Sequence, residues 1–146
     1  QEVIVGKCKL ILTELLTNAL KHPAIPTTII SIIIDEEKIR ITKSDRGRPF
    51  YLDKEKNRPA LQWPLKGYDG ERIVIYEDQM CSLYGFIENE NKVVFSAEDL
   101  LVQIPPRPKN ILEHFGLMIL TKSSNSFIYC YDPATQTNIF ESKIFF

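Results

Sequence analysis

The first stretch of the chain carries apolar residues at the spacing of a helix. They recur every three or four positions over residues 3–22, and at about 100° per residue they fall on one arc. The residues on this arc are Ile4, Cys8, Ile11, Leu12, Leu15 and Ala19. Pro23 ends the pattern, because the residue before a proline is pushed away from the helical region. A helix is therefore predicted from residue 3 to residue 22.

The following segments have the two-residue period of strands. Residues 27–34 are apolar and β-branched, which predicts a buried strand, and residues 39–44 alternate apolar and polar side chains, which predicts a second strand of a hairpin. Further elements are predicted as strands over 72–77, 81–88, 92–96, 126–131 and 138–146, and as a helix over 111–123 with Gly116 near or before its start. This order predicts an α+β fold, a two-layer α/β sandwich with helices on one face of a mainly antiparallel sheet.

The composition excludes several classes of protein. The 146 residues are 44% hydrophobic, enough for a single domain with a buried core, and a net charge of −1 provides no basic surface for nucleic acid or an anionic membrane. No apolar run approaches the ~20 residues that span a bilayer. Cys8, Cys81 and Cys130 are widely spaced, which is typical of reduced thiols in a cytoplasmic protein. Two histidines are too few for a zinc cluster.

The first candidate for chemistry lies on the predicted helix. Glu14 and Asn18 are four residues apart, so they stack on one helical face at the rim of the apolar arc. An amide oxygen is a suitable Mg²⁺ ligand where phosphates and waters fill the other positions, and a carboxylate one turn away can orient or deprotonate a nucleophile. The simpler interpretation is an amphipathic helix with a solvated glutamate and an edge asparagine.

The second candidate is the turn that follows the predicted hairpin. Asp45 at the end of a strand is a strong acceptor for an exocyclic amine, and Gly47 lets the backbone approach a planar ring. An Asp-x-Gly sequence is also common in ordinary turns, so both interpretations stay open.

Together these motifs resemble those of the GHKL ATPase superfamily of gyrase, histidine kinase and MutL type, whose nucleotide-binding domain is called the Bergerat fold. The N-box is similar to Glu14-x-x-x-Asn18-Ala-x-Lys-His22, and the first glycine box to Asp45-Arg-Gly47-Arg-Pro49. A remnant of the second glycine box is similar to Gly116-Leu-Met-Ile. The stretch TELLTNALKH is most similar to the anti-sigma-factor serine kinases, and the resemblance covers about residues 8–50 and 112–146.

The resemblance implies ATP and Mg²⁺ as cofactors and a role for each matching residue. Glu14 would be the catalytic base, Asn18 would bind Mg²⁺ and the phosphates, and Asp45 would accept from the adenine amine. Gly47 would leave room for the ring, and Gly116 would offer its N–H to a phosphate at a helix N-terminus. Lys21 and His22 would touch phosphate or ribose.

The sequence departs from the family between the two glycine boxes. Residues 51–112 stand where a short ATP lid is expected, and we expect an inserted β-rich subdomain or an extended lid in the single domain 1–146. In the second box, Glu113 would bring negative charge to the phosphates and Phe115 would hinder close approach of the backbone.

These observations leave three functions. The first is an ATP-Mg²⁺-binding serine/threonine kinase of the anti-sigma type, with a sigma factor or a protein antagonist as partner. The second is a non-catalytic interaction or sensory module that uses the inserted segment for recognition. The third is the ATPase domain of a sensor histidine kinase. A homodimer is compatible with each of them. A pocket filled by Phe115 or by the inserted segment favours the second, and an open pocket among Glu14, Asn18, Asp45 and Gly47 favours an enzyme.

Overall fold

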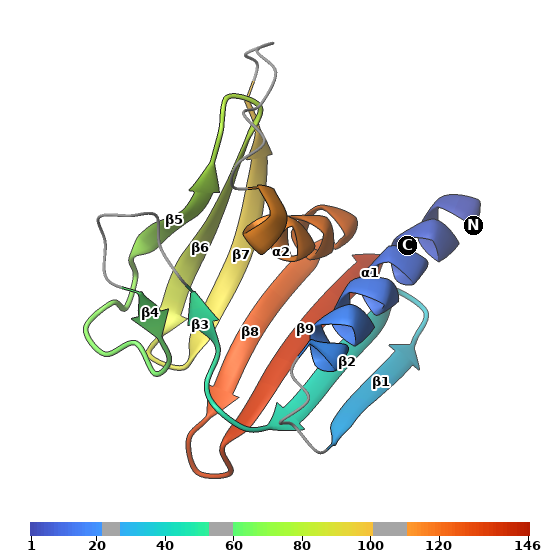
Figure 1. Cartoon of the computed structure of the whole chain (residues 1–146). Coiled ribbons are helices and arrows are strands. Elements are labelled where there is room, and N and C mark those ends of the chain that lie inside the picture. The colour runs from blue at the N-terminus through green and yellow to red at the C-terminus, as the bar shows by residue number, and fades with distance from the viewer. Residues whose placement is uncertain (22–26, 53–59, 101–110) are drawn as a thin grey trace.

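One antiparallel sheet runs through almost the whole chain in the computed structural model, which describes residues 1–21, 27–52, 60–100 and 111–146. The strands are β1 (Thr28–Ile34), β2 (Lys38–Arg46), β3 (Tyr51–Leu52), β4 (Leu61–Gln62), β5 (Arg72–Glu77), β6 (Cys81–Asn89), β7 (Lys92–Asp99), β8 (Ser126–Asp132) and β9 (Thr137–Phe145). Seven of them form the sheet in the order β1-β2-β9-β8-β7-β6-β5, and β3 and β4 pair separately (Figure 1).

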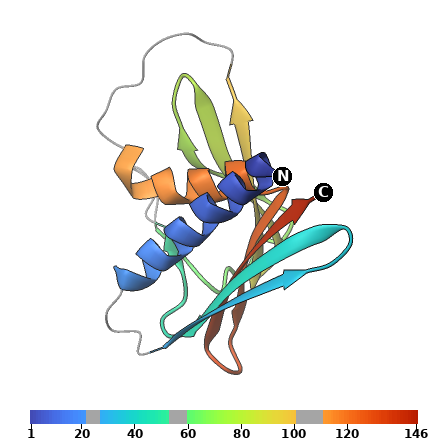
Figure 2. The same cartoon turned by 90° about the vertical axis from the view of Figure 1, so that its right-hand side faces the viewer.

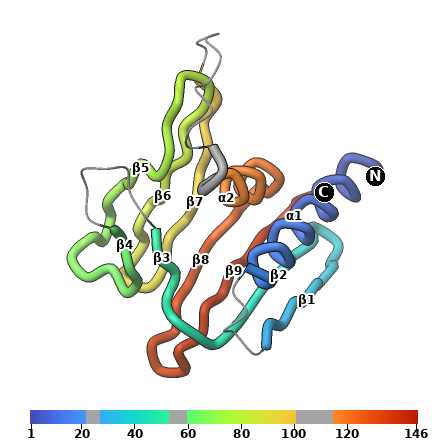
Figure 3. Tube along the Cα trace, viewed as in Figure 1, coloured from blue at the N-terminus to red at the C-terminus, as the bar shows by residue number. Residues whose placement is uncertain are grey.

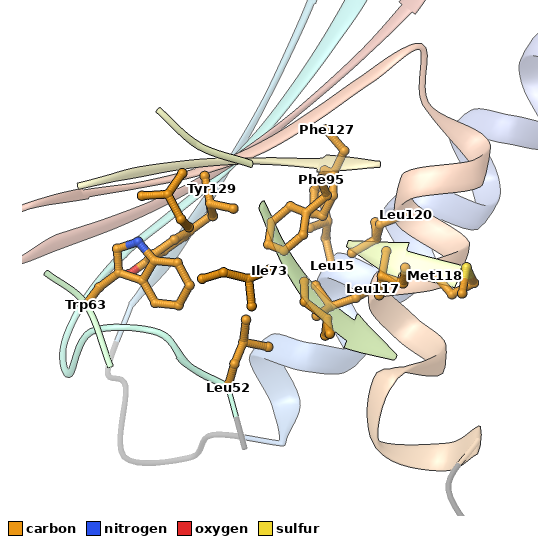
Figure 4. Packing of buried hydrophobic residues seen from close by; sticks show 14 of the residues in the cluster. Leu15, Leu52, Trp63, Ile73, Phe95, Leu117, Met118, Leu120, Phe127 and Tyr129 are labelled. Atoms are coloured by element: carbon orange, nitrogen blue, oxygen red, sulfur yellow. The ribbon is translucent and has the colours of Figure 1, made fainter. Parts of the chain in front are cut away.

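Two helices lie against the same face of this sheet, α1 (Glu2–Leu20) and α2 (Ile111–Ser123) (Figures 1 and 2). The apolar arc of α1 brings Ile11 and Leu15 into the core, where both are fully buried. Leu117 and Leu120 of α2 are buried beside them, and Figure 4 shows these side chains converging with Phe95 and Phe127 from the sheet. The core therefore lies between the helices and one sheet face.

The residues of β2 alternate between the two faces of the sheet. Ile39 and Ile41 are buried on the helix side, and Lys43 and Asp45 continue the same row toward the end of the strand. The register carries this row into β9, because Asp45 pairs with Asn138 and Lys43 pairs with Phe140. Charged side chains thus occupy core positions at one end of the sheet.

The predicted fold class is wrong. The strands expected in an insertion at the ATP-lid position are not set apart, since β7 pairs with β8 through residues 92–95 and carries β6 and β5 into the same sheet. Backbone groups at the edge of β8 find their partners in this pairing. The result is a mostly antiparallel seven-stranded sheet with only two helices in the described chain, and not a two-layer α/β sandwich of the Bergerat type.

Most individual elements have nearly the predicted bounds, with two exceptions. The short strands β3 and β4 form in a stretch that carries no clear period in the sequence. Gly116 is the sixth residue of α2, so the prediction that it lies near or before the start of this helix is wrong. Neither of the two described helices is long and apolar enough to cross a membrane.

Candidate functional site

The two helices bring together three of the predicted site residues. A Cβ placed on Gly116 would lie 2.9 Å from Oε2 of Glu14 and 3.9 Å from both Oδ1 and Nδ2 of Asn18. The two segments that resemble an N-box and a second glycine box are about a hundred residues apart in sequence, and they meet at the contact between α1 and α2 (Figure 3). A carboxylate and an amide here face a stretch of helix backbone.

The position of Gly116 limits what its backbone can bind. Only the first four N–H groups of a helix lack an intrahelical acceptor, and the sixth residue lies beyond them. The N–H of Gly116 is thus committed to the helix, which disfavours the predicted hydrogen bond to a phosphate. What Gly116 provides is the absence of a side chain where Glu14 packs.

The carboxylate of Asp45 is engaged on both oxygens. Nζ of Lys43 lies 3.3 Å from Oδ2, and Nδ2 of Asn138 donates to Oδ1 at 3.0 Å. The side chains of Lys43 and Asp45 are only 5% and 4% exposed, so this is a buried ion pair. The assigned acceptor of the adenine amine is therefore occupied by partners from its own chain.

Asn138 extends this pair into a buried network. Its Nδ2 also donates to the carbonyl oxygen of Arg48 at 2.9 Å, and its Oδ1 accepts from the Tyr129 hydroxyl at 2.6 Å. The same hydroxyl accepts from the backbone N–H of Phe50 at 2.8 Å. Burial raises the pKa of Tyr129 well above its usual range, so the hydroxyl keeps the proton that it donates to Asn138. The network fixes the loop after β2 against β8 and β9.

An aromatic cluster packs against this network. The ring centroid of Trp63 lies 5.3 Å from that of Tyr129 in an edge-to-face arrangement and 5.6 Å from that of Phe50. Phe140, the fourth member, lies 4.8 Å from Tyr129 and carries the Lys43 ammonium over its ring at 5.5 Å. Trp63 directly follows β4 and is 2% exposed (Figure 4). The indole ring of Trp63 thus packs against Phe50 and Tyr129, two residues that take part in this network.

Gly47 lies in the loop that this network holds, and the other predicted site residues are Lys21 at the end of α1 and His22. The Gly47 N–H donates to the carbonyl oxygen of Gln136 at 3.2 Å, so it closes the end of the β2–β9 pair. Lys21 caps α1 and is exposed at its end. His22 lies outside the described residues. Within the described ranges, no group of three or more His, Cys, Asp or Glu side chains could hold a metal ion. Magnesium at Asn18 would therefore depend on ligands that a bound phosphate brings.

A hollow that was not predicted from the sequence lies between α2 and the start of β6. Its volume is about 460 Å³, and its wall is mainly apolar. Phe115, Met118 and Ile119 of α2 form one side, and Met80 with Cys81 at the start of β6 form the other. We call this hollow the α2–β6 groove. Phe115, predicted as an obstacle to phosphate binding, is half-exposed and lines this groove instead of filling a nucleotide pocket.

The rim of the groove is charged and held by local contacts. Nζ of Lys122 lies 2.6 Å from Oδ1 of Asp99. Oδ1 of Asp78 accepts from the backbone N–H groups of Met80 and Cys81, which fixes the turn between β5 and β6. Burial raises the pKa of the Cys81 thiol, so this side chain stays neutral in the wall. No periodic signal marks the groove, because its two sides come from segments far apart in the sequence.

No family model, curated protein or solved structure matches the chain.

Proposed function

We propose that the chain is a non-catalytic partner-binding module that receives an apolar segment of another protein in the α2–β6 groove. The observation that carries this proposal is the engagement of Asp45 by Lys43 and Asn138, in a buried network whose Tyr129 packs against the indole of Trp63. These contacts leave neither carboxylate oxygen of Asp45 free for a base, which supports an interaction module over a nucleotide-binding enzyme.

The energetics of Asp45 disfavour ATP at the predicted site. An adenine amine would have to replace the Asn138 amide or the Lys43 ammonium on the carboxylate. Displacing the ammonium would leave a buried charge without a partner, which costs about 3–5 kcal/mol when such pairs are broken. The residues present therefore fit a structural network better than a base-binding pocket.

The chemistry of the groove favours a helical partner with an apolar face. Methionine and phenylalanine walls adapt to the side chains of an amphipathic helix, a common mode of peptide recognition. Leu10 of α1 extends the apolar wall. The carboxylates of Asp78 and Asp99 outnumber the one ammonium of Lys122 among the lining residues, which favours a partner helix with basic flanks.

The test uses a display library of amphipathic helical peptides selected on the wild-type chain. Phe115→Asp places a charge in the groove, and Val74→Asp is the matched control, because Val74 is an exposed apolar residue of β5 outside the groove. We expect the selected peptides to bind Phe115→Asp at least tenfold more weakly and Val74→Asp as tightly as wild type. Equal binding to Phe115→Asp and wild type, or no selected peptide, would contradict the proposal.

One observation favours the kinase as a second candidate. Glu14 and Asn18 meet Gly116 at the α1–α2 contact, which is the neighbourhood that Mg²⁺ and phosphates would need. Such a kinase would act on a sigma-factor antagonist or a similar protein partner. The ATPase domain of a histidine kinase needs the same residues, so the two ATP-dependent candidates, the anti-sigma-type kinase and the histidine kinase, share one ATP site. Loss of Mg²⁺-dependent ATP binding in Asn18→Ala distinguishes this candidate from the first.

A cytoplasmic location fits either function. Cys8, Cys81 and Cys130 are all free thiols, as expected in a reducing compartment.

A further inference from the structure

The outer edge of β1 is built unlike the opposite edge of the sheet. β1 and β5 are the two end strands, and in the described chain β1 pairs with β2 alone (Figures 1 and 3). β5 begins and ends with a charged residue and has an irregular register between Val74 and Tyr76. Charged side chains and bulges usually protect an edge strand from pairing with a strand of another chain. β1 carries no charge, no proline and no glycine, and its seven residues pair with β2 without a register shift.

Both faces of this edge expose isoleucine. The register with β2 places Ile32 and Ile34 on the helix face, opposite the buried Ile41 and Ile39. Ile29 and Ile33 lie on the other face, and all four exposed isoleucines have between 48% and 67% of their surface in solvent. A regular, uncharged strand with exposed apolar side chains on both faces is a template for another strand.

The neighbouring flank of α1 adds to this apolar surface. Glu14 and Asn18 face α2, so residues about half a turn around the helix point the other way, toward β1. Val5 and Leu16 lie on that flank, and each is about half exposed. Both side chains therefore lie on the side of α1 that is turned away from α2.

Charges at the two ends of β1 indicate which strand pairs there. Arg46 is exposed beside its first residue, and Asp35, Glu36 and Glu37 are exposed after its last residue. When two β1 strands run antiparallel, the basic end of one copy meets the acidic end of the other. Such a contact is isologous, because each copy offers the same surface to its partner across a twofold axis.

We propose that the chain forms a homodimer in which the β1 strands of two copies pair antiparallel about Ser31. In this register Ile29 of one copy lies opposite Ile33 of the other, and Ile30 lies opposite Ile32. The pairing satisfies the outward backbone groups of both edges, joins the two sheets and covers the exposed isoleucines. It concerns an edge remote from the α2–β6 groove, so it does not depend on the proposed function.

Oxidative cross-linking tests this register. Ser31→Cys places two thiols opposite each other at the axis, within the range of Cα separations that a disulfide spans. Ile33→Cys on the same strand is the matched control, since residue 33 faces residue 29 of the other copy. We expect a disulfide-linked dimer for Ser31→Cys and little above the wild-type background for Ile33→Cys. Equal cross-linking of both variants, or none of Ser31→Cys, would overturn the proposal.

Charge complementation gives a second test by light scattering after gel filtration. Ile29→Glu and Ile33→Lys are each expected to be monomeric where the wild-type chain is dimeric. Mixed together they are expected to form a heterodimer, because the new carboxylate at position 29 of one copy meets the new ammonium at position 33 of the other, while the second Ile29–Ile33 contact is kept. Val74→Lys on β5 is the control and should stay dimeric. A monomeric wild-type chain at 100 μM, or a mixture that stays monomeric, would refute the antiparallel dimer.

Discussion

The Lys43 ammonium and the Asp45 carboxylate form a buried ion pair at 3.3 Å, two residues apart on the same strand and on its core-facing side. Their position explains why the best candidate for an adenine-binding residue is engaged within the protein. Asn138 from the adjacent strand completes the contact at 3.0 Å. The pair therefore contributes to the structure of the sheet end, where three segments of the chain meet.

Removal of Lys43 should destabilise the protein strongly. Lys43→Met leaves the Asp45 charge buried without its cation, and we expect the free energy of unfolding to fall by about 3 kcal/mol. Adding Asp45→Asn to this variant should recover much of the loss, because the neutral amide needs no counterion. The measurement is urea unfolding at neutral pH.

Lys38→Met is the control for this experiment. Lys38 also pairs with an aspartate, but Asp35 and Lys38 are both partly exposed and 3.7 Å apart. Exposed pairs contribute about 0–1 kcal/mol. If Lys43→Met destabilises the protein no more than Lys38→Met does, the Lys43–Asp45 ion pair does not contribute the expected stability.

The sequence predicted much of the local structure but not how the elements assemble. The alternation in β2 predicted the buried Ile39 and Ile41, and it places Lys43 on the same face, a signal of a buried cation. The pairing of β7 with β8 was missed, since it joins segments separated by α2 and carries no local mark. Trp63 lies in a stretch without a clear period, so its burial against Tyr129 had no signal in the sequence. The proximity of Glu14, Asn18 and Gly116 joins two helices that are far apart in the sequence, and no local pattern marks it.

The Tyr129 hydroxyl should make stability fall in alkaline solution. Burial raises its pKa in the folded state above the usual value of about 10, and the unfolded chain keeps the usual value. Below that pH the residue is protonated in both states and its contribution is fully present. Above it only the unfolded state ionises, so the free energy of unfolding falls by up to ~1.4 kcal/mol per pH unit.

Tyr129→Phe isolates this effect in urea unfolding across the alkaline range. The variant should be less stable at neutral pH by about 1–3 kcal/mol, because the Asn138 oxygen and the Phe50 N–H lose their partner. Its stability should then fall less steeply than that of wild type above pH ~10. Equal slopes in the two proteins would contradict a buried, protonated hydroxyl.

Two glycine substitutions should have opposite effects on stability. A Cβ at Gly116 would come too close only to the flexible end of the Glu14 side chain, so Gly116→Ala should stabilise α2 by up to ~1 kcal/mol. A Cβ at Gly85 would lie 2.7 Å from Cγ2 of the buried Val93, so Gly85→Ala should destabilise the sheet by about 1–3 kcal/mol. Urea unfolding of both variants checks this. Destabilisation by Gly116→Ala would mean that Glu14 is held more rigidly than its contacts indicate.

Calorimetric titration of the chain with ATP and with ADP, each with Mg²⁺, tests the central claim most directly. Because Lys43 and Asn138 engage both carboxylate oxygens of Asp45, we expect no saturable heat at millimolar nucleotide for the wild-type chain or for Asn18→Ala. Saturable, Mg²⁺-dependent binding by the wild-type chain that is lost in Asn18→Ala would contradict the partner-binding module and establish the nucleotide site.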